Sequence, residues 1–331
     1  MTALLEVDDL VVRFATPDGQ NTAVRGVSFS VEAGERVGIV GESGSGKSVT
    51  AQAVMRLLGP AASLGGGAVR FDGRDVLEFD SGTLRRWRGA QAAMVFQDPL
   101  SSLNPLIRIG MQVTETLREH LGMDRRAATA RAVELLSEVG ISDAAGRLRE
   151  YPMTFSGGMR QRVAIAIAVS CSPKLLIADE PTTALDVTVQ AQVLDLMDRM
   201  TAELGTAVIL ISHDLGVVST FCDRILVMYA GRVVESGTTQ EIVDDPRHPY
   251  TKALLASIPA MTGELPRRLP SIPGSPPHSG RPFQGCAFAG RCPLAEDVCR
   301  ESDPALLSLG PTRRVACHVA ARAVTAKGET S

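Results

Sequence analysis

Aromatic residues are scarce in this sequence: they make up 4% of the chain, and Trp87 is the only tryptophan. A base-stacking platform of the single-strand-binding type is therefore not expected. An excess of basic residues is also missing, because the formal net charge is −3 and the sequence pI is about 6.0. Nothing in this balance suggests a surface that neutralises a polyanion, so the composition argues against nucleic acid as a partner.

Long uncharged apolar runs are absent as well. No segment approaches the roughly 18 residues that span a bilayer, and the acidic N-terminus lacks the layout of a signal peptide. The sequence therefore predicts a cytosolic protein whose link to a membrane comes through partners. Its 331 residues, 44% of them hydrophobic, are enough for one large domain or two ordinary ones.

A glycine-rich segment, Gly41–Ser48, lies between an apolar strand expected over 36–40 and a helix expected over 49–58. Its glycines let successive backbone N–H groups surround phosphates, and the helix directs its positive end toward them. Lys47 adds a charge for the outer phosphates, and the Ser48 hydroxyl can bind Mg²⁺. We therefore predict a nucleoside triphosphate site on this phosphate loop, made by Gly41, Ser43, Gly44, Ser45, Gly46, Lys47, Ser48 and Val49.

Two adjacent carboxylates follow a second apolar strand, 175–179. Ligands bind at the C-terminal ends of strands in open α/β sheets, so these acids are candidates for the reaction centre. We interpret Asp179 as a Mg²⁺ ligand together with Ser48, and Glu180 as the general base that polarises the attacking water. A solvated turn is the alternative, and the phosphate loop in the same chain favours the catalytic interpretation.

Ser156, Gly157 and Gly158 precede a helix expected over 163–169 and form a second phosphate-cradling pattern. Because one chain has one triphosphate to hold, this second pattern suggests a surface that serves the nucleotide of a neighbouring chain.

Short β-branched runs alternate with helical patterns from residue 4 to about 250, which is typical of a parallel sheet covered by helices. A mostly helical insertion follows residue 98, and it includes a helix capped by Asp124 that ends at Gly140. Prolines cluster between Pro259 and Pro282, which indicates a linker or irregular arm. The expected strands are 35–40, 91–96, 174–179, 206–211 and 224–229.

Four of the six cysteines fall in the last segment of the chain, where a core is not expected. Reduced cytosolic thiols in such a segment suggest a structural metal site, a metal staple that holds the segment together. Their C-x5-C-x6-C-x17-C spacing is not that of ordinary zinc sites. Three readings stay open: a [4Fe–4S] cluster, zinc with Cys317 or His318, and unliganded thiols. Cys171 and Cys222 are expected to be small buried hydrophobes. The candidate cluster ligands are Cys286, Cys292, Cys299 and Cys317.

Together these motifs resemble the nucleotide-binding subunit of an ABC transporter, over residues 4 to about 250. The resemblance implies an α/β fold of the P-loop ABC type over residues 1–250, with a RecA-like parallel sheet core, an antiparallel β subdomain and a helical subdomain at about 98–172. A small, irregular, Cys-rich C-terminal extension is expected over 251–331.

The same resemblance implies a role for each motif. Gly41–Ser48 resembles the Walker A loop, and Leu175–Glu180 resembles the Walker B strand. Ser156–Gln161 resembles the ABC signature, and Ala184–Asp186 resembles the D-loop. The nucleotide of the partner chain is then expected to meet Ser156, Gly157, Gly158, Gln161 and Asp186.

Three single residues gain a role only through the resemblance. Gln97 resembles the Q-loop glutamine, which senses Mg²⁺ and water, and His213 resembles the switch histidine at the γ-phosphate. Phe14 falls where the family stacks an aromatic ring on adenine. The expected catalytic set is therefore Glu180, His213 and Gln97, and the expected Mg²⁺ set is Ser48, Gln97 and Asp179.

Further motifs resemble those of the oligopeptide/dipeptide/nickel importer branch. The resemblance implies a peripheral subunit at the cytoplasmic face of the membrane that drives peptide uptake by ATP hydrolysis. Its expected partners are two permease subunits, an extracytoplasmic solute-binding protein and a second ATP-binding subunit, with a heterodimer favoured over a homodimer. The motifs are Phe96–Pro105, Pro181–Gln190, His248–Thr251, Ser271–Pro277, Gly285–Phe288, Arg291–Pro293 and Arg313–His318.

Three other functions remain open from the sequence. The same motor could serve nickel or another small solute, because nothing in the chain itself selects the substrate. A non-transport ABC ATPase of translation or DNA repair is a second alternative, and it lacks support because no tandem cassette, coiled-coil insertion or basic surface is evident. A third has the cysteine arm act as a redox or iron sensor that gates transport.

Overall fold

The computed structural model describes residues 3–17, 19–98, 102–182, 186–257, 272–277 and 284–322. The chain divides into two compact units. Residues 1–4, 31–36 and 72–211 belong to the first unit, and residues 5–30, 37–71 and 212–331 belong to the second. Most of the proline-rich stretch lies outside the described residues, as do Ala184 and Leu185 of the expected D-loop.

The first unit contains three parallel strands in the order β8-β7-β6. Every residue of β7 and β8 is buried, as expected for apolar strands covered on both faces. The register pairs Val95 with Ala178, and Asp179 with Ile211, so the C-terminal ends of the strands meet at one edge. The strands are β6 (Ala92–Val95), β7 (Leu175–Asp179) and β8 (Ala207–Ser212), close to the ranges expected from the sequence.

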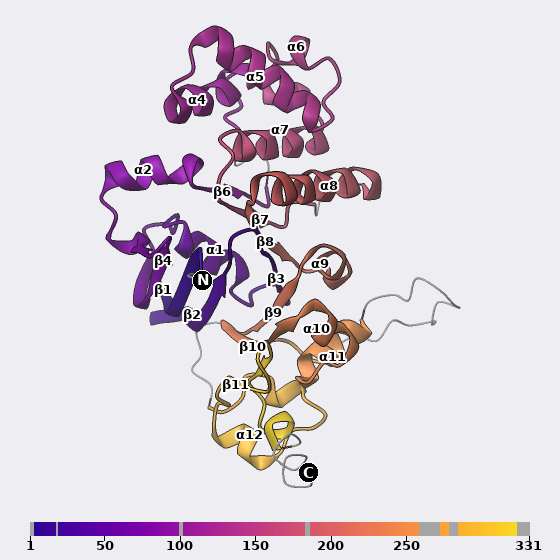
Figure 1. Ribbon diagram of the computed structural model, residues 1–331. Coiled ribbons are helices and arrows are strands. Elements are labelled where there is room, and N and C mark those ends of the chain that lie inside the picture. Colours follow the sequence, from indigo (N-terminus) through magenta and orange to yellow (C-terminus); the bar gives the residue numbers. More distant parts are fainter. Residues whose placement is uncertain are drawn as a thin grey trace. The chain divides into compact units, whose positions relative to one another are not determined.

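The helices of the first unit include a group in which α4, α5 and α7 pack on one another (Figure 1). Asp124 begins α5 by accepting a hydrogen bond from the Ala127 N–H at 2.8 Å, and Gly140 follows the helix with a φ of 74°. Helical spacing predicts one apolar face for this helix, and its residues are all buried: Ala128, Ala132, Leu135, Leu136 and Val139. The helices are α2 (Ser81–Ala90), α4 (Ile109–Leu121), α5 (Arg125–Glu138), α6 (Ala144–Arg147), α7 (Gly157–Val169) and α8 (Val187–Leu204), with 3-10 turns at Val76–Glu78 and Pro152–Thr154 and a short strand, β5, at Arg74–Asp75.

Two details of these helices differ from the expectation. Helix α7 begins at Gly157 rather than at Val163, because the Ser156 side chain caps it. The helical spacing of Val189, Val193, Leu196, Met197, Met200 and Leu204 predicts core packing along the whole of α8, and this prediction is wrong at the two ends. Leu204 is 54% exposed at the last turn before Gly205, and Val189 in the first turn is only half-buried.

The second unit contains two sheets. In one, with the order β2-β1-β4, strands β1 and β4 are antiparallel. In the other, β3 runs parallel to β9, and the order continues through β10 and β12 to β11. The strands are β1 (Leu5–Thr16), β2 (Gly19–Val31), β3 (Arg36–Val40), β4 (Ala62–Phe71), β9 (Arg224–Tyr229), β10 (Arg232–Thr238), β11 (Leu307–Ser308) and β12 (Arg314–Val315).

Short helices complete the second unit. Thr238 and Glu241 form a capping box at the start of α10, with each side chain accepting the other residue's backbone N–H. The helices are α1 (Lys47–Val54), α9 (Leu215–Phe221), α10 (Thr239–Asp244), α11 (Pro249–Ala256) and α12 (Asp297–Glu301), with a 3-10 turn at Ala289–Arg291.

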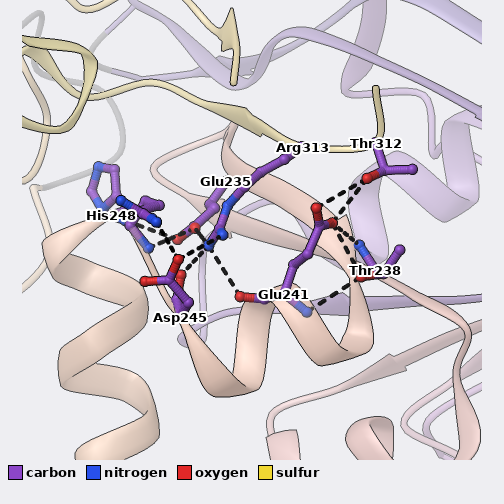
Figure 2. A network of polar contacts seen from close by, with 8 residues as sticks. Glu235, Thr238, Glu241, Asp245, His248, Thr312 and Arg313 are labelled. Atoms are coloured by element: carbon purple, nitrogen blue, oxygen red, sulfur yellow. Dashed lines mark hydrogen bonds and ion pairs between the residues drawn. The ribbon is translucent and has the colours of Figure 1, made fainter. Parts of the chain in front are cut away.

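A polar network with a buried centre joins Thr312 and Arg313, just before β12, to β10 and α10 (Figure 2). Glu235 is fully buried, and its carboxylate accepts hydrogen bonds from Arg313 at 3.0 Å and from the His248 backbone N–H at 2.9 Å. Arg313 also bonds the backbone carbonyl of Glu241 at 3.0 Å. Because these charges are paired and hydrogen-bonded, the network is compatible with burial.

Candidate functional site

The phosphate loop Gly41–Ser48 connects β3 to α1 in the second unit. Gly41 and Gly46 have φ values of 156° and 100°, and a Cβ on Gly41 would lie 2.2 Å from the Met228 carbonyl oxygen. A Cβ on Gly46 would lie 2.8 Å from the Ala23 carbonyl oxygen. Glycine is therefore required at both positions by backbone conformation and by close approach.

Lys47 lies at the first position of α1 and is 5% exposed. Its ammonium group donates hydrogen bonds to the carbonyl oxygens of Gly41 at 2.7 Å and Glu42 at 3.1 Å. This places a buried positive charge beside the N-terminus of a helix, within a loop of glycine residues. Such an arrangement suits a polyanion such as a triphosphate. The Ser45 hydroxyl is buried and has no hydrogen-bond partner among the described residues.

The loop also has contacts that the sequence did not predict. Glu42 donates its backbone N–H to the Tyr250 hydroxyl at 2.8 Å, and its carboxylate accepts two hydrogen bonds from Arg291, at 2.7 and 2.9 Å. Burial raises the pKa of Tyr250, so this phenol stays neutral. Tyr250 and Arg291 lie within motifs that the sequence marked, but no spacing or periodicity indicated that either would contact the loop.

The two expected catalytic side chains of the first unit meet at the edge of its sheet. The Gln97 Nε2 atom donates a hydrogen bond to Glu180 Oε2 at 3.0 Å. The contact follows from the register, because Gln97 and Glu180 each come two residues after a paired residue of neighbouring parallel strands. Asp179, immediately before Glu180, is 3% exposed.

Glu180 has a left-handed backbone, with a φ of 47°, and its N–H donates to the Ile211 carbonyl at 2.9 Å. A non-glycine residue in this conformation costs on the order of 1 kcal/mol, and such strain occurs preferentially at functional sites. The fixed backbone and the bond from Gln97 together hold the Glu180 carboxylate at the C-terminal end of the strands.

Ser156 and Asp186 cap two helices that border one surface cavity of about 310 Å³ in the first unit. The Ser156 hydroxyl accepts from the Met159 N–H at 3.3 Å, and the Asp186 carboxylate accepts from the Val189 N–H at 2.9 Å. Arg162 also lines this cavity, and its guanidinium group donates a hydrogen bond to the Gly140 carbonyl at 2.9 Å. The lining residues are Gly140, Ile141, Ser142, Ser156, Gly158, Met159, Arg162, Asp186 and Val189.

Other expected site residues lie apart from these groups. Gln161 is 3% exposed, does not line the cavity, and its two side-chain polar atoms have no partner among the described residues. His213 follows β8 and is exposed. Phe14 is half-buried in β1, opposite Ala62 of β4. The structure thus contains two half-sites: the phosphate loop, Phe14 and His213 belong to the second unit, and the remaining expected nucleotide-site residues belong to the first.

Two family models match the chain. The model for ABC transporters matches residues 24–183, and the model for the C-terminal region of oligopeptide/dipeptide transporters matches residues 234–299. The chain is 50% identical to the oligopeptide transport ATP-binding protein OppD of Salmonella typhimurium over 95% of its length and 93% of the relative. The OppD protein of Bacillus subtilis is 48% identical, over 95% of the chain and 88% of the relative.

The chain belongs to the ATP-binding subunits of ABC transporters. Solved structures agree with this family. A dimeric ATP-binding cassette in a post-hydrolysis state, bound to ADP and Pi, matches with a TM-score of 0.65 and 27% identity, over 71% of the chain and 98% of the cassette. A cassette from Clostridium perfringens that is part of an ABC transporter complex matches with a TM-score of 0.61 and 28% identity, over 74% of the chain and 92% of the cassette.

The ABC family assignment confirms the P-loop ABC fold and the ATPase class that the motifs indicated. It also identifies ATP as the nucleotide for which the loop is built, with Mg²⁺ as its expected companion ion. Among the residues that the structure describes, no helix is both long and apolar enough to cross a membrane.

The cysteines of the C-terminal region are brought near one another, because Cys286 and Cys292 each interact electrostatically with Cys299 and Cys317. The Cys286 N–H donates to the Cys299 carbonyl at 2.8 Å, and all four thiols are free. Burial raises the pKa of Cys286 to about 11 and also raises the pKa of Cys292, so both thiols are protonated at neutral pH. Cys171 and Cys222 are buried, as expected.

The expected metal staple is not confirmed. Within the described ranges, which include all four candidate ligands, no group of three or more His, Cys, Asp or Glu side chains is arranged to hold a metal ion. Four thiols are donors that suit iron–sulfur or zinc, but their side chains would have to reorient to bind either one.

Replacing Gly46 with Ala is expected to weaken ATP binding about tenfold or more, because the new Cβ meets the Ala23 carbonyl in a strained left-handed backbone. Equilibrium titration with a fluorescent ATP analogue measures the change. Gly59→Ala is the control, because a Cβ there meets no atom within 4 Å. Wild-type affinity in Gly46→Ala would contradict this account of the loop.

Proposed function

We propose that this chain is the ATP-hydrolysing motor subunit of an ABC importer that drives uptake of oligopeptides or dipeptides across the cytoplasmic membrane. The observation that carries the proposal is the identity of about half of all residues to oligopeptide transport ATP-binding proteins of two enteric bacteria, over 95% of the chain and 93% of each relative. The match to the C-terminal region of oligopeptide/dipeptide transporters supports the same substrate class.

In the proposed mechanism, Lys47 and the loop N–H groups bind the phosphates, and Ser48, Asp179 and Gln97 hold Mg²⁺. The bound ion neutralises charge that develops on the phosphate oxygens. Glu180 accepts a proton from the attacking water, and the hydrogen bond from Gln97 orients its carboxylate. The remaining contacts assigned by resemblance to the family are His213 to the γ-phosphate and Phe14 to the adenine.

The signature surface is proposed to act on the nucleotide of a second ATP-binding subunit. Gly157 is exposed and begins α7, and a Cβ placed on it would meet no other atom within 4 Å. A phosphate can therefore approach this helix N-terminus closely. The buried Gln161 amide, which lacks a partner in the described part of the chain, is a polar group that binding could satisfy.

A head-to-tail dimer follows, in which ATP is held between the phosphate loop of one subunit and Ser156, Gly157, Gly158 and Asp186 of the other. The dimeric state of the similar ADP-bound cassette supports this arrangement. We expect the companion to be a different ATP-binding chain, with a homodimer as the alternative. ATP-driven closure then moves two permease subunits, which receive the peptide from an extracytoplasmic solute-binding protein, and the motor lies at the cytoplasmic face of the membrane.

For the four cysteines of the C-terminal region we propose a [4Fe–4S] cluster as the occupant to test first, supported by four free thiols in a reduced compartment. The side chains would have to rotate to bind it, and no step of the ATPase mechanism depends on it. In protein purified without oxygen, about four iron and four labile sulfide per chain would support the cluster. One zinc per chain would support the zinc alternative. Absence of both iron and zinc would show that the thiols are unliganded.

The experiment for the import function measures ATPase activity of the assembled transporter with its binding protein. Binding protein loaded with di- or oligopeptides is expected to stimulate hydrolysis several-fold over empty binding protein. The matched control is the same complex with Glu180→Gln, which should show no stimulation. Stimulation by nickel or another small solute alone would favour the alternative substrate, and activity that ignores the permease and binding protein would favour a non-transport ATPase.

A further inference from the structure

Arg291 in the C-terminal region donates hydrogen bonds from all three nitrogens of its guanidinium group. It forms the bidentate pair with Glu42 described above, and Nη1 also donates to the Tyr229 hydroxyl at 3.2 Å. Nε donates to the Pro273 carbonyl at 2.9 Å, and Nη2 donates to the Ile272 carbonyl at 3.3 Å. The Arg291 side chain is 7% exposed and the Glu42 side chain is 24% exposed, so the pair is partly shielded from water and salt.

Aromatic packing fixes the position of this arginine. The Tyr229 and Tyr250 rings lie 4.6 Å apart, and Phe288 meets each of them at 5.4 Å between ring centroids. The Arg291 guanidinium carbon lies 5.9 Å from the ring centroids of Tyr229 and Phe288. Since Phe288 and Tyr250 are fully buried, or nearly so, the C-terminal region is seated on the core of the second unit at this point.

Glu42 links the C-terminal region to the Lys47 ammonium group of the phosphate loop. Its side chain binds Arg291, its N–H binds Tyr250, and its carbonyl accepts the Lys47 ammonium. Three different groups of one residue are thus fixed by three partners, two of which lie beyond residue 249. The Gly41–Glu42 peptide carries both the Glu42 N–H that donates to Tyr250 and the Gly41 carbonyl that accepts from Lys47, so rotation of this one peptide would break both bonds.

We propose that Arg291 is a positioning residue of the nucleotide site, which holds the first turn of the phosphate loop through Glu42 and thereby makes ATP affinity depend on the C-terminal region. Arg291 acts through Glu42 and need not contact ATP. The inference rests on the ATPase assignment but not on the peptide as substrate, so failure of peptide stimulation leaves it testable.

The test is carried out on the full-length chain with Mg²⁺ and a fluorescent ATP analogue, followed by ATPase kinetics of the assembled complex. Arg291→Ala is expected to raise the dissociation constant for the ATP analogue about tenfold, because a partly buried bidentate pair is lost and Glu42 is left without its partner. KM for ATP should rise by a similar factor, while kcat changes less than about twofold. Arg291→Lys keeps the charge but loses the bidentate geometry of the guanidinium group, so its dissociation constant should lie between those of the wild type and Arg291→Ala.

Two variants separate positioning from general loss of structure. Arg300→Ala removes an exposed arginine from α12 in the same region and should bind ATP as the wild type does. Glu42→Gln keeps the size of the side chain and should weaken binding in the same direction as Arg291→Ala. In the Glu42→Gln background, Arg291→Ala should raise the dissociation constant much less than it does in the wild-type chain, because the contact that the two residues share is already weakened.

Wild-type affinity and KM in folded Arg291→Ala would overturn the proposal, as would full additivity of the two substitutions. If Arg291→Ala does not fold, wild-type ATP affinity in Glu42→Gln would overturn it instead. Failure of the wild-type chain to bind ATP would contradict the ATPase assignment rather than the role of Arg291.

Discussion

Glu180→Gln is expected to slow ATP hydrolysis by about 10²–10⁴-fold, because it removes the only proton acceptor assigned to the attacking water. ATP binding should persist, since the substitution keeps the size of the side chain and a carbonyl oxygen that can still accept the hydrogen bond from Gln97. Phosphate release from the assembled complex, measured together with equilibrium binding of an ATP analogue, separates the two effects.

The matched control is Glu203→Gln, an exposed carboxylate near the C-terminal end of α8 in the same unit, which should hydrolyse ATP at the wild-type rate. Wild-type turnover in Glu180→Gln would remove Glu180 from the mechanism and direct attention to another base. Loss of nucleotide binding in that variant would instead show that Glu180 acts by holding the site together.

Arg313→Ala is expected to lower the free energy of unfolding by about 3–5 kcal/mol, because it leaves the fully buried Glu235 carboxylate without its ionic partner. Two backbone N–H groups, of Arg247 and His248, still bond that carboxylate, but they do not neutralise it. Thermal denaturation followed by circular dichroism should show a lower melting temperature, by about 6 °C or more.

Arg314→Ala provides the comparison at the neighbouring position. Its side chain is exposed, and surface substitutions usually change the free energy of unfolding by less than about 0.5 kcal/mol. Equal melting temperatures for the two variants would mean that the network in Figure 2 contributes little to stability.

The sequence predicted those parts of the molecule that local patterns determine. The phosphate loop was recognisable because φ, close approach and charge restrict Gly41, Gly46 and Lys47 to a few residue types. Buried parallel strands were recognisable because both of their faces are apolar. Helix α5 was predicted through its cap and its terminal glycine, although the first turn of α7 was missed because glycine pairs resemble a loop.

Contacts between segments that are distant in the sequence could not be predicted from such local patterns. Glu42 and Arg291 are 249 residues apart, and no periodicity in either segment indicates that they meet. The contact between Gln97 and Glu180 depends on the register of two strands, which the sequence does not specify. Leu204 kept the helical spacing of the α8 stripe but lies beyond the core, because spacing gives a face and not the depth to which it is buried.

ATP hydrolysis by this chain is proposed to drive peptides inward, and a transport assay is the most direct test of that role. The measurement is accumulation of a radiolabelled oligopeptide in proteoliposomes that contain the assembled transporter, with ATP on the side of the motor and loaded binding protein on the other. Peptide uptake is expected to require ATP and to disappear with Glu180→Gln. Hydrolysis that accompanies uptake of nickel or another solute, with no peptide accumulated, would contradict it.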